Sequence, residues 1–274
     1  MRELITVDNP IKDYSEMYAD AFVDVREKLD SPPLALSIGG HEYRGEYVPS
    51  RFGTYGNFSC IVGASKSRKS FLKSLLSASY IGGQSIEYAP EIQGYRDSEK
   101  FILDFDTEQG KFDSQNTFKR TCRIVGSCND LYKPFSLRKF GFNERLEFIE
   151  YCILDKFKDK VGLVLIDGFA DLVSDTNDLT QANEMVQKLM MWTDVSQCHL
   201  IGVIHQVGDT QKATGHLGSA IQKKAETVCF LKYIDKTTTQ VHFKYNRGYP
   251  IDDFEFAVGM DGLPRTQDIE DGEY

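Results

Sequence analysis

The segment from Gly63 to Ser70 reads GASKSRKS, and its residue types could bind a phosphate group. It follows the apolar run 57–62 and precedes a helical apolar run. In a loop between a strand and a helix, the backbone N–H groups and the positive end of the helix attract phosphate oxygens. Lys69 stands where a lysine neutralises terminal phosphates, and Ser70 stands where a hydroxyl joins a Mg²⁺ shell. The predicted nucleotide-binding residues are Gly63, Ala64, Ser65, Lys66, Ser67, Arg68, Lys69, Ser70 and Phe71.

This loop departs from the usual pattern G-x-x-x-x-G-K-[ST] at one position, where Arg68 replaces the glycine before the lysine. A side chain there requires backbone torsions that are open to residues other than glycine. Three interpretations remain open. Arg68 adds charge to the phosphate site, or it marks a loop that binds nucleotide without fast turnover. In the third, the loop is a basic turn at the start of a helix, with Lys66, Arg68 and Lys69 solvated.

A carboxylate suited to Mg²⁺ follows at the end of the apolar segment 161–167, which reads VGLVLID. Such a segment predicts a buried parallel strand, and Asp167 then lies at the carboxyl edge of the sheet, where the loop before Phe71 also begins. Mg²⁺ that bridges two phosphates prefers a carboxylate in or near its first shell. We therefore expect Ser70 and Asp167 to hold the metal. The alternative is that Asp167 only begins a loop.

A third candidate group follows the apolar segment 101–106, where the chain continues as Thr107, Glu108 and Gln109. A glutamate at a strand end can polarise the water that attacks a terminal phosphate. We predict this role for Glu108. The alternative is that the acids here form only a polar strand terminus.

The elements that would position these residues alternate between strands and helices. Short apolar runs predict strands at 33–39, 57–63, 100–106, 123–126, 161–168, 199–205, 227–233 and 239–245. Helical spacing is found at 70–82, 143–157 and 179–197. This order predicts an α/β fold with a mostly parallel central sheet, helices on both faces and an antiparallel C-terminal extension.

Three parts of the chain are expected to differ in character. Residues 1–33 have helical spacing before the breaker Ser31-Pro32-Pro33 and predict a helical arm, 34–260 form the core, and 261–274 form an acidic, flexible tail. No apolar run approaches the length of a membrane span, and the six cysteines form no C-x-x-C pair. We expect a cytoplasmic protein with no membrane partner. The net charge of −9 excludes a protein that coats nucleic acid through its overall field.

The order of these motifs resembles the RecA-like P-loop ATPases, which include hexameric replicative helicases of the RepA and DnaB type and RadA recombination proteins. The resemblance extends from about residue 34 to 258. It implies binding of ATP and Mg²⁺, with Glu108 on the strand of the catalytic glutamate and 163–167 as the Walker B strand. The segment 199–206, HLIGVIHQ, resembles the next core strand. Gln206 at its end would sense the terminal phosphate, and His205 is the alternative candidate for this role.

The resemblance also implies assembly. Residues 243–248, FKYNRG, resemble the K-x-N-R-x-G element that related ATPases place near the nucleotide of a neighbouring subunit. Lys244 and Arg247 would then stabilise transition-state charge in trans in a homo-oligomer, either a hexameric ring or a filament. The alternative is a hairpin of exposed basic residues.

Two loops of this family face a central channel, and their counterparts here are about 171–183 and 208–217. The second is flexible and mildly basic, as a loop that follows single-stranded DNA should be. The first is acidic and argues against tight phosphate contact. The leading hypothesis is an ATP-hydrolysing motor acting on DNA, helicase-like or recombinase-like. The alternatives are a nucleotide-dependent regulatory or assembly switch with slow or absent hydrolysis, and a degenerate loop without nucleotide.

Overall fold

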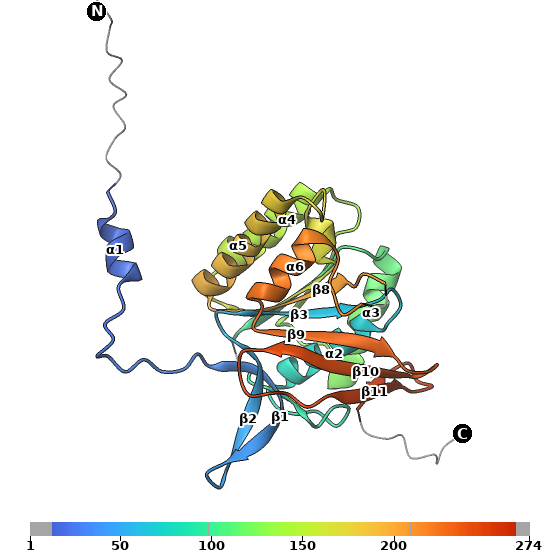
Figure 1. Ribbon diagram of the computed structural model, residues 1–274. Coiled ribbons are helices and arrows are strands. Elements are labelled where there is room, and N and C mark those ends of the chain that lie inside the picture. Colours follow the sequence, from blue (N-terminus) through green and yellow to red (C-terminus); the bar gives the residue numbers. More distant parts are fainter. Residues whose placement is uncertain (1–12, 98, 209, 267–274) are drawn as a thin grey trace, which may run out of the picture. The chain divides into compact units, whose positions relative to one another are not determined.

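A computed structural model describes residues 13–97, 99–208 and 210–266 of the 274-residue chain (Figure 1). The chain divides into two compact units, Met1–Ser31 and Pro32–Tyr274. In the first unit the described residues contain the helix α1 (Ser15–Ala21), which has no buried residue. A helical arm was predicted over 1–33, and residues 1–12 of that prediction lie outside the described residues.

The second unit is built on a large sheet whose strands follow the order β12-β11-β10-β9-β3-β8-β7-β5-β6. From β9 to β6 every neighbouring pair is parallel, and from β9 to β12 every pair is antiparallel. The strands are β3 (Phe58–Gly63), β5 (Phe101–Asp106), β6 (Tyr132–Ser136), β7 (Val161–Asp167), β8 (His199–His205), β9 (Thr227–Tyr233), β10 (Thr238–Asn246), β11 (Phe254–Val258) and β12 (Pro264–Arg265). The prediction of an α/β fold with a mostly parallel central sheet is therefore confirmed.

Helices cover both faces of this sheet (Figure 1). One core packs α4 (Phe142–Tyr151), its π-helical continuation Cys152–Lys156, α5 (Leu179–Ser196) and α6 (Gly215–Lys224) on the sheet. The other core packs α2 (Lys69–Gly82) and α3 (Lys111–Val125) on the opposite face. Strands β3 and β7 are buried along their whole length because both of their faces are covered. A polar group on these strands therefore needs a partner inside the protein.

The sequence of α5 shows how such a helix is specified. The side chain of Asp178 accepts a hydrogen bond from the backbone N–H of Gln181 (2.9 Å) and caps the first turn. Buried residues then recur at helical spacing and direct one face to the sheet; they are Ala182, Met185, Val186, Leu189, Trp192 and Thr193.

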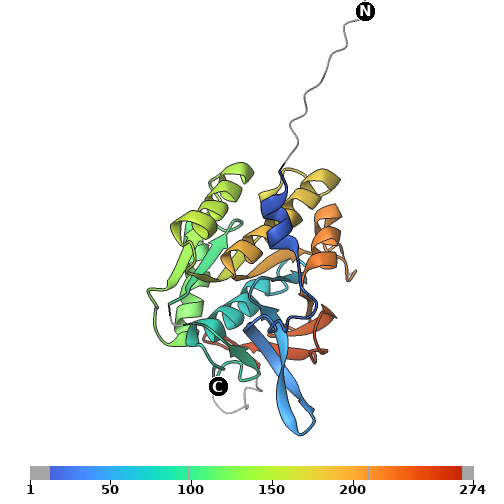
Figure 2. The same cartoon turned by 90° about the vertical axis from the view of Figure 1, so that its left-hand side faces the viewer.

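A smaller antiparallel sheet contains β1 (Leu34–Tyr43), β2 (Glu46–Thr54) and the short β4 (Ile92–Gly94), in the order β2-β1-β4. We predicted β1 only, as a strand at 33–39. The outer end of the β1–β2 hairpin projects from the rest of this unit in both views (Figures 1 and 2). Tyr43 and Tyr47 near this end are exposed.

Two sequence predictions are wrong. The strand expected at 123–126 is the end of α3, because Thr117, Phe118, Thr121 and Ile124 are buried at helical spacing and Gly126 (φ 83°) then ends the helix. The expected tail at 261–274 begins too early, since β12 pairs with β11. Residues 267–274 of that prediction lie outside the described residues. The patterns of α3 and α6 also went unrecognised as helices.

Within the described residues, no helix is long and apolar enough to cross a membrane.

Candidate functional site

The carboxyl ends of β3, β5, β7 and β8 meet at one edge of the sheet, and the candidate site lies there. The order of the sheet places β8 between β3 and β7, and β5 beside β7. Gly63 on β3 pairs with His205 on β8, and Asp106 on β5 pairs with Asp167 on β7. Residues far apart in the sequence therefore come together because the strands that carry them are parallel.

The loop at 63–70 connects β3 directly to α2. Its backbone is left-handed at Lys66 (φ 63°) and Arg68 (φ 64°), so Arg68 adopts the conformation that glycine provides without strain. A side chain at Gly63 would collide with the hydroxyl of Ser67. The loop is thus a tight turn that brings backbone N–H groups and the first turn of α2 together.

Lys69, the first residue of α2, points back into this turn. Its Nζ donates to the carbonyl oxygens of Gly63 (3.0 Å) and Ala64 (2.7 Å) and lies 3.3 Å from Nδ1 of His205. Burial lowers the pKa of Lys69, and the carboxylates of Asp167 and Glu108 act in the opposite direction. The ammonium group is therefore held at the loop by two backbone carbonyls, which an anionic ligand could replace.

The side chain of Arg68 leaves the loop and contacts the β9–β10 hairpin. Its guanidinium donates to the hydroxyl of Thr239 (2.9 Å) and the carbonyl of Thr238 (3.2 Å), and it lies 4.7 Å from the ring centre of Tyr233. It also contacts the carbonyl of Lys236. This orientation of the Arg68 side chain does not favour the interpretation that Arg68 adds charge to the phosphate site.

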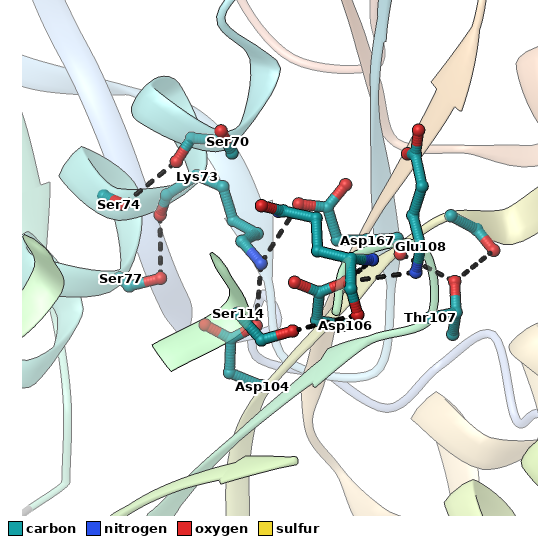
Figure 3. A network of polar contacts seen from close by, with 12 residues as sticks. Ser70, Lys73, Ser74, Ser77, Asp104, Asp106, Thr107, Glu108, Ser114 and Asp167 are labelled. Carbon is teal, nitrogen blue, oxygen red and sulfur yellow. Dashed lines mark hydrogen bonds and ion pairs between the residues drawn. The ribbon is translucent and has the colours of Figure 1, made fainter. Parts of the chain in front are cut away.

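Asp167 does not stand alone at the end of β7, because Lys73 approaches it from α2 (Figure 3). The Lys73 ammonium lies 2.9 Å from Oδ1 of Asp104 and 3.2 Å from Oδ2 of Asp167. Burial lowers the pKa of Lys73, but the two carboxylates outweigh burial, so its pKa lies above the usual range. Sequence reasoning missed this lysine. The signal was Asp104, a charged residue inside an apolar strand that needs a buried partner.

Glu108 reaches the same place from the end of β5. One oxygen of Asp106, Oδ1, accepts hydrogen bonds from the backbone N–H groups of Glu108 (3.0 Å) and Gln109 (2.9 Å) and fixes this turn. The Glu108 side chain is 57% exposed, and its Oε2 lies 3.7 Å from Nε2 of His205. The contact with His205 holds the pKa of Glu108 below its usual value. Glu108, Asp167 and His205 line a small cavity of about 130 Å³.

Of the two residues considered at the end of β8, His205 faces Lys69 and Glu108, whereas Gln206 turns away. The side-chain amide of Gln206 donates to the carbonyl of Gly208 (2.7 Å). Gln206 lines a separate cavity of about 740 Å³ beside the loop, together with Ser65, Lys66 and Tyr233. The alternation of side chains along an extended strand separates the two neighbours.

Lys244 and Arg247 are not brought to this edge of the sheet. Near them, Tyr245 on β10 lies opposite Val228 at the beginning of β9. Because β9 and β3 are parallel, this beginning lies at the opposite end from the loop at 63–70, which follows the end of β3. Lys244 donates to the carbonyl of Gln211 (2.8 Å), and Arg247 donates to the carbonyl of Lys224 (2.7 Å). They line a groove of about 680 Å³ that also contains Lys212 and Lys223. This groove is basic and separate from Glu108 and Asp167.

The prediction that Ser70 and Asp167 hold a metal ion requires further ligands, such as a bound phosphate. Within the described residues, no group of three or more His, Cys, Asp or Glu side chains could hold a metal ion. Mg²⁺ commonly uses one or two protein oxygens and completes its shell with phosphates and waters. Oδ2 of Asp167 contacts Lys73, and Oδ1 accepts no hydrogen bond from the described residues. One carboxylate oxygen therefore remains for such an ion.

Arg120 is a second cation that the sequence analysis did not identify. From α3 its guanidinium donates to the backbone carbonyl of Ser70 (3.4 Å) and lies 3.7 Å from the ring centre of Phe71. Phe71 therefore packs under an arginine, and both lie in or beside the first turn of α2.

No protein-family model matches this chain, and no curated protein matches it either.

Proposed function

We propose that this chain is a RecA-like P-loop ATPase that binds Mg-ATP at the loop 63–70 and hydrolyses it to drive movement on DNA. The observation that carries the proposal is the convergence of four strand ends on one edge of the sheet. They bring a phosphate-binding turn with Lys69, a carboxylate for the metal, and Glu108 beside His205 into one site. A glutamate within reach of a water and a lysine at a phosphate loop are the groups that hydrolysis of a nucleoside triphosphate requires.

In this proposal each described group has one task. The N–H groups of the turn and Lys69 bind the β- and γ-phosphates, and Ser70 and Asp167 hold Mg²⁺, which supplies charge neutralisation between the phosphates. Glu108 accepts a proton from the attacking water. His205 contacts both Lys69 and Glu108, so it is better placed than Gln206 to respond to the γ-phosphate.

Assembly of several copies is part of the proposal and concerns the basic groove. Because Lys244 and Arg247 lie away from the nucleotide site of their own chain, a role in phosphoryl transfer requires a second copy. Head-to-tail contacts between copies produce a ring or a filament. A cation supplied in this way stabilises the charge of the transition state, so hydrolysis would depend on assembly.

The first test is equilibrium binding of a fluorescent ATP analogue with Mg²⁺ to the wild type, to Lys69→Ala and to Lys158→Ala. Lys158 is exposed and serves as a control for total charge. We expect Lys69→Ala to weaken binding about 100-fold, since it removes a charge-assisted contact with phosphate. Equal affinity of the wild type and Lys69→Ala contradicts the proposed site. The motor function is tested by measuring turnover with and without single-stranded DNA and by light scattering with Mg-ATP. A protein that remains monomeric and whose turnover does not change when the DNA is added contradicts it.

A second candidate function is a nucleotide-dependent switch of the same fold, and the contacts of Arg68 favour it. Arg68 joins the loop to Tyr233 and Thr239, so a ligand that moves the loop also pulls on the β9–β10 hairpin. The discriminating measurement is hydrolysis by Glu108→Gln. A large loss relative to the wild type supports the ATPase, and a wild-type rate that is already negligible supports the switch.

A further inference from the structure

Lys73 is a buried cation to which the proposed hydrolysis assigns no role. Its side chain is 1% exposed, and its ammonium lies between Asp104 on β5 and Asp167 on β7 (Figure 3). It belongs to α2, four residues after Lys69, so the two lysines lie on neighbouring turns of one helix face. Lys69 points to the loop, whereas Lys73 points into the sheet.

The partners of Lys73 are rigid and specific. Asp104 is 1% exposed and accepts a second hydrogen bond from the hydroxyl of Tyr132 (2.6 Å). This bond occupies Oδ2 of Asp104, so Lys73 meets a carboxylate that cannot rotate freely. Lys73 is in turn fixed by its helix and by its hydrogen bond to Asp104, and its ammonium also forms an ion pair with Asp167.

The contact orients the carboxylate of Asp167. Lys73 contacts Oδ2, while Oδ1 accepts no hydrogen bond from the described residues and Asp167 lines the cavity shared with Glu108 and His205. A carboxylate that has one oxygen in an ion pair keeps the other oxygen available to a ligand. Groups of this kind behind a metal ligand commonly change metal affinity by about 10- to 100-fold.

We propose that Lys73 is a positioning residue, which holds Oδ2 of Asp167 so that Oδ1 faces the Mg²⁺ that accompanies the nucleotide. The inference rests on the proposed function, because it requires a nucleotide at the loop 63–70. Lys73 does not contact the phosphates and takes no part in proton transfer. It links α2, which carries Lys69 and Ser70, to the strands that carry Glu108 and Asp167, so the three elements keep one relative position.

A charge-matched variant tests the idea. Lys73→Met alone would leave Asp104 buried and unpaired, so we use Lys73→Met/Asp104→Asn, which removes one positive and one negative charge and preserves the net charge of the cluster. The matched control is Asp104→Asn, which keeps the contact between Lys73 and Asp167. Folding of each protein is checked by circular dichroism and thermal melting.

The measurement is binding of a fluorescent ATP analogue as a function of Mg²⁺ concentration, with a parallel titration in EDTA. We expect the double variant to need about 10-fold more Mg²⁺ for half-maximal enhancement of binding, and the control to stay close to the wild type. Affinity in EDTA should be equal in the wild type and the double variant, because their clusters have the same net charge. If the double variant does not fold, Lys73→Gln/Asp104→Asn retains a donor and should show a smaller increase.

The outcomes separate this inference from the proposed function. A wild type that binds nucleotide with Mg²⁺, together with a double variant of unchanged Mg²⁺ requirement, overturns the role of Lys73 and leaves the nucleotide site standing. A weaker affinity of the double variant in EDTA shows general damage to the site and also overturns positioning. A wild type that binds no Mg-nucleotide overturns both proposals.

Discussion

Nε2 of His205 lies 3.7 Å from Oε2 of Glu108, although the two residues come from different strands, β8 and β5. The opposite ring nitrogen, Nδ1, lies 3.3 Å from the Lys69 ammonium. A single imidazole therefore connects the residue proposed to bind the terminal phosphates with the residue proposed to activate water.

The pH dependence of hydrolysis should depend on His205. The contact with His205 keeps the pKa of Glu108 below its usual value, so Glu108 remains ionised to lower pH. In His205→Asn this pKa rises towards its ordinary value, and the acidic limb of the pH–rate profile should move to higher pH. Gln206→Ala should leave the position of that limb unchanged. A limb that moves in Gln206→Ala but not in His205→Asn contradicts the assignment.

The strained backbone at Arg68 can be measured with two substitutions. Both Arg68→Ala and Arg68→Gly remove the contacts with Tyr233 and Thr239, but only glycine relieves the left-handed conformation at φ 64°. We expect the glycine variant to be more stable than the alanine variant by about 1 kcal/mol in urea unfolding. Equal stability of the two would show that the loop changes conformation when the arginine is lost.

The Lys73–Asp104 pair should show strong energetic coupling. Lys73→Met leaves a carboxylate that is 1% exposed without its cation, and this should lower the free energy of unfolding by about 3–5 kcal/mol. Lys73→Met/Asp104→Asn removes both charges and should recover most of that loss. The measurement is urea unfolding of the wild type, both single variants and the double variant. Additive losses would mean that the ion pair contributes little.

The turn after β7 depends on close packing between Gly202 and Phe169. A methyl group at Gly202 would overlap the Phe169 ring, which follows Asp167 by two residues. Gly202→Ala should therefore destabilise the fold by about 1–3 kcal/mol. Gly82→Ala is the control, because its new methyl group would meet only Ile86 at 3.6 Å. Thermal melting compares the stability of the two variants. If Gly202→Ala melts at the same temperature as Gly82→Ala, the Phe169 ring can move to make room for the methyl group.

Mixing two inactive variants tests whether the site is completed between copies. Lys69→Ala should lose nucleotide binding, and Arg247→Ala should bind nucleotide but hydrolyse it slowly. If Arg247 acts on the nucleotide of a neighbour, an equal mixture contains sites with both residues intact and should recover roughly a quarter of the wild-type rate. A mixture with no more activity than its components would place Arg247 outside the hydrolysis reaction.

Much of this site could be predicted from the sequence because its signals are local. An apolar run that ends at Asp167 indicates a buried strand with an acid at its edge, and the change from an apolar run to a helical one around Lys69 indicates a strand, a turn and a helix. The alternation of such units also predicts a parallel sheet. Strands β2, β4 and β6 were missed because their patterns mix polar and apolar residues, and packing against distant elements determines them.

By itself, the sequence determined which residues stand at strand ends and that those ends share an edge of the sheet. Only the tertiary structure decided which side chains meet. It brought His205, and not Gln206, beside Lys69 and Glu108. It also turned Arg68 to the β9–β10 hairpin and placed Lys73 between Asp104 and Asp167. The physical reason is strand order, because β8 lies between β3 and β7 and α2 packs on the sheet beside β5 and β7. Contacts between residues so distant in sequence depend on how the strands are arranged, and no local pattern records that arrangement.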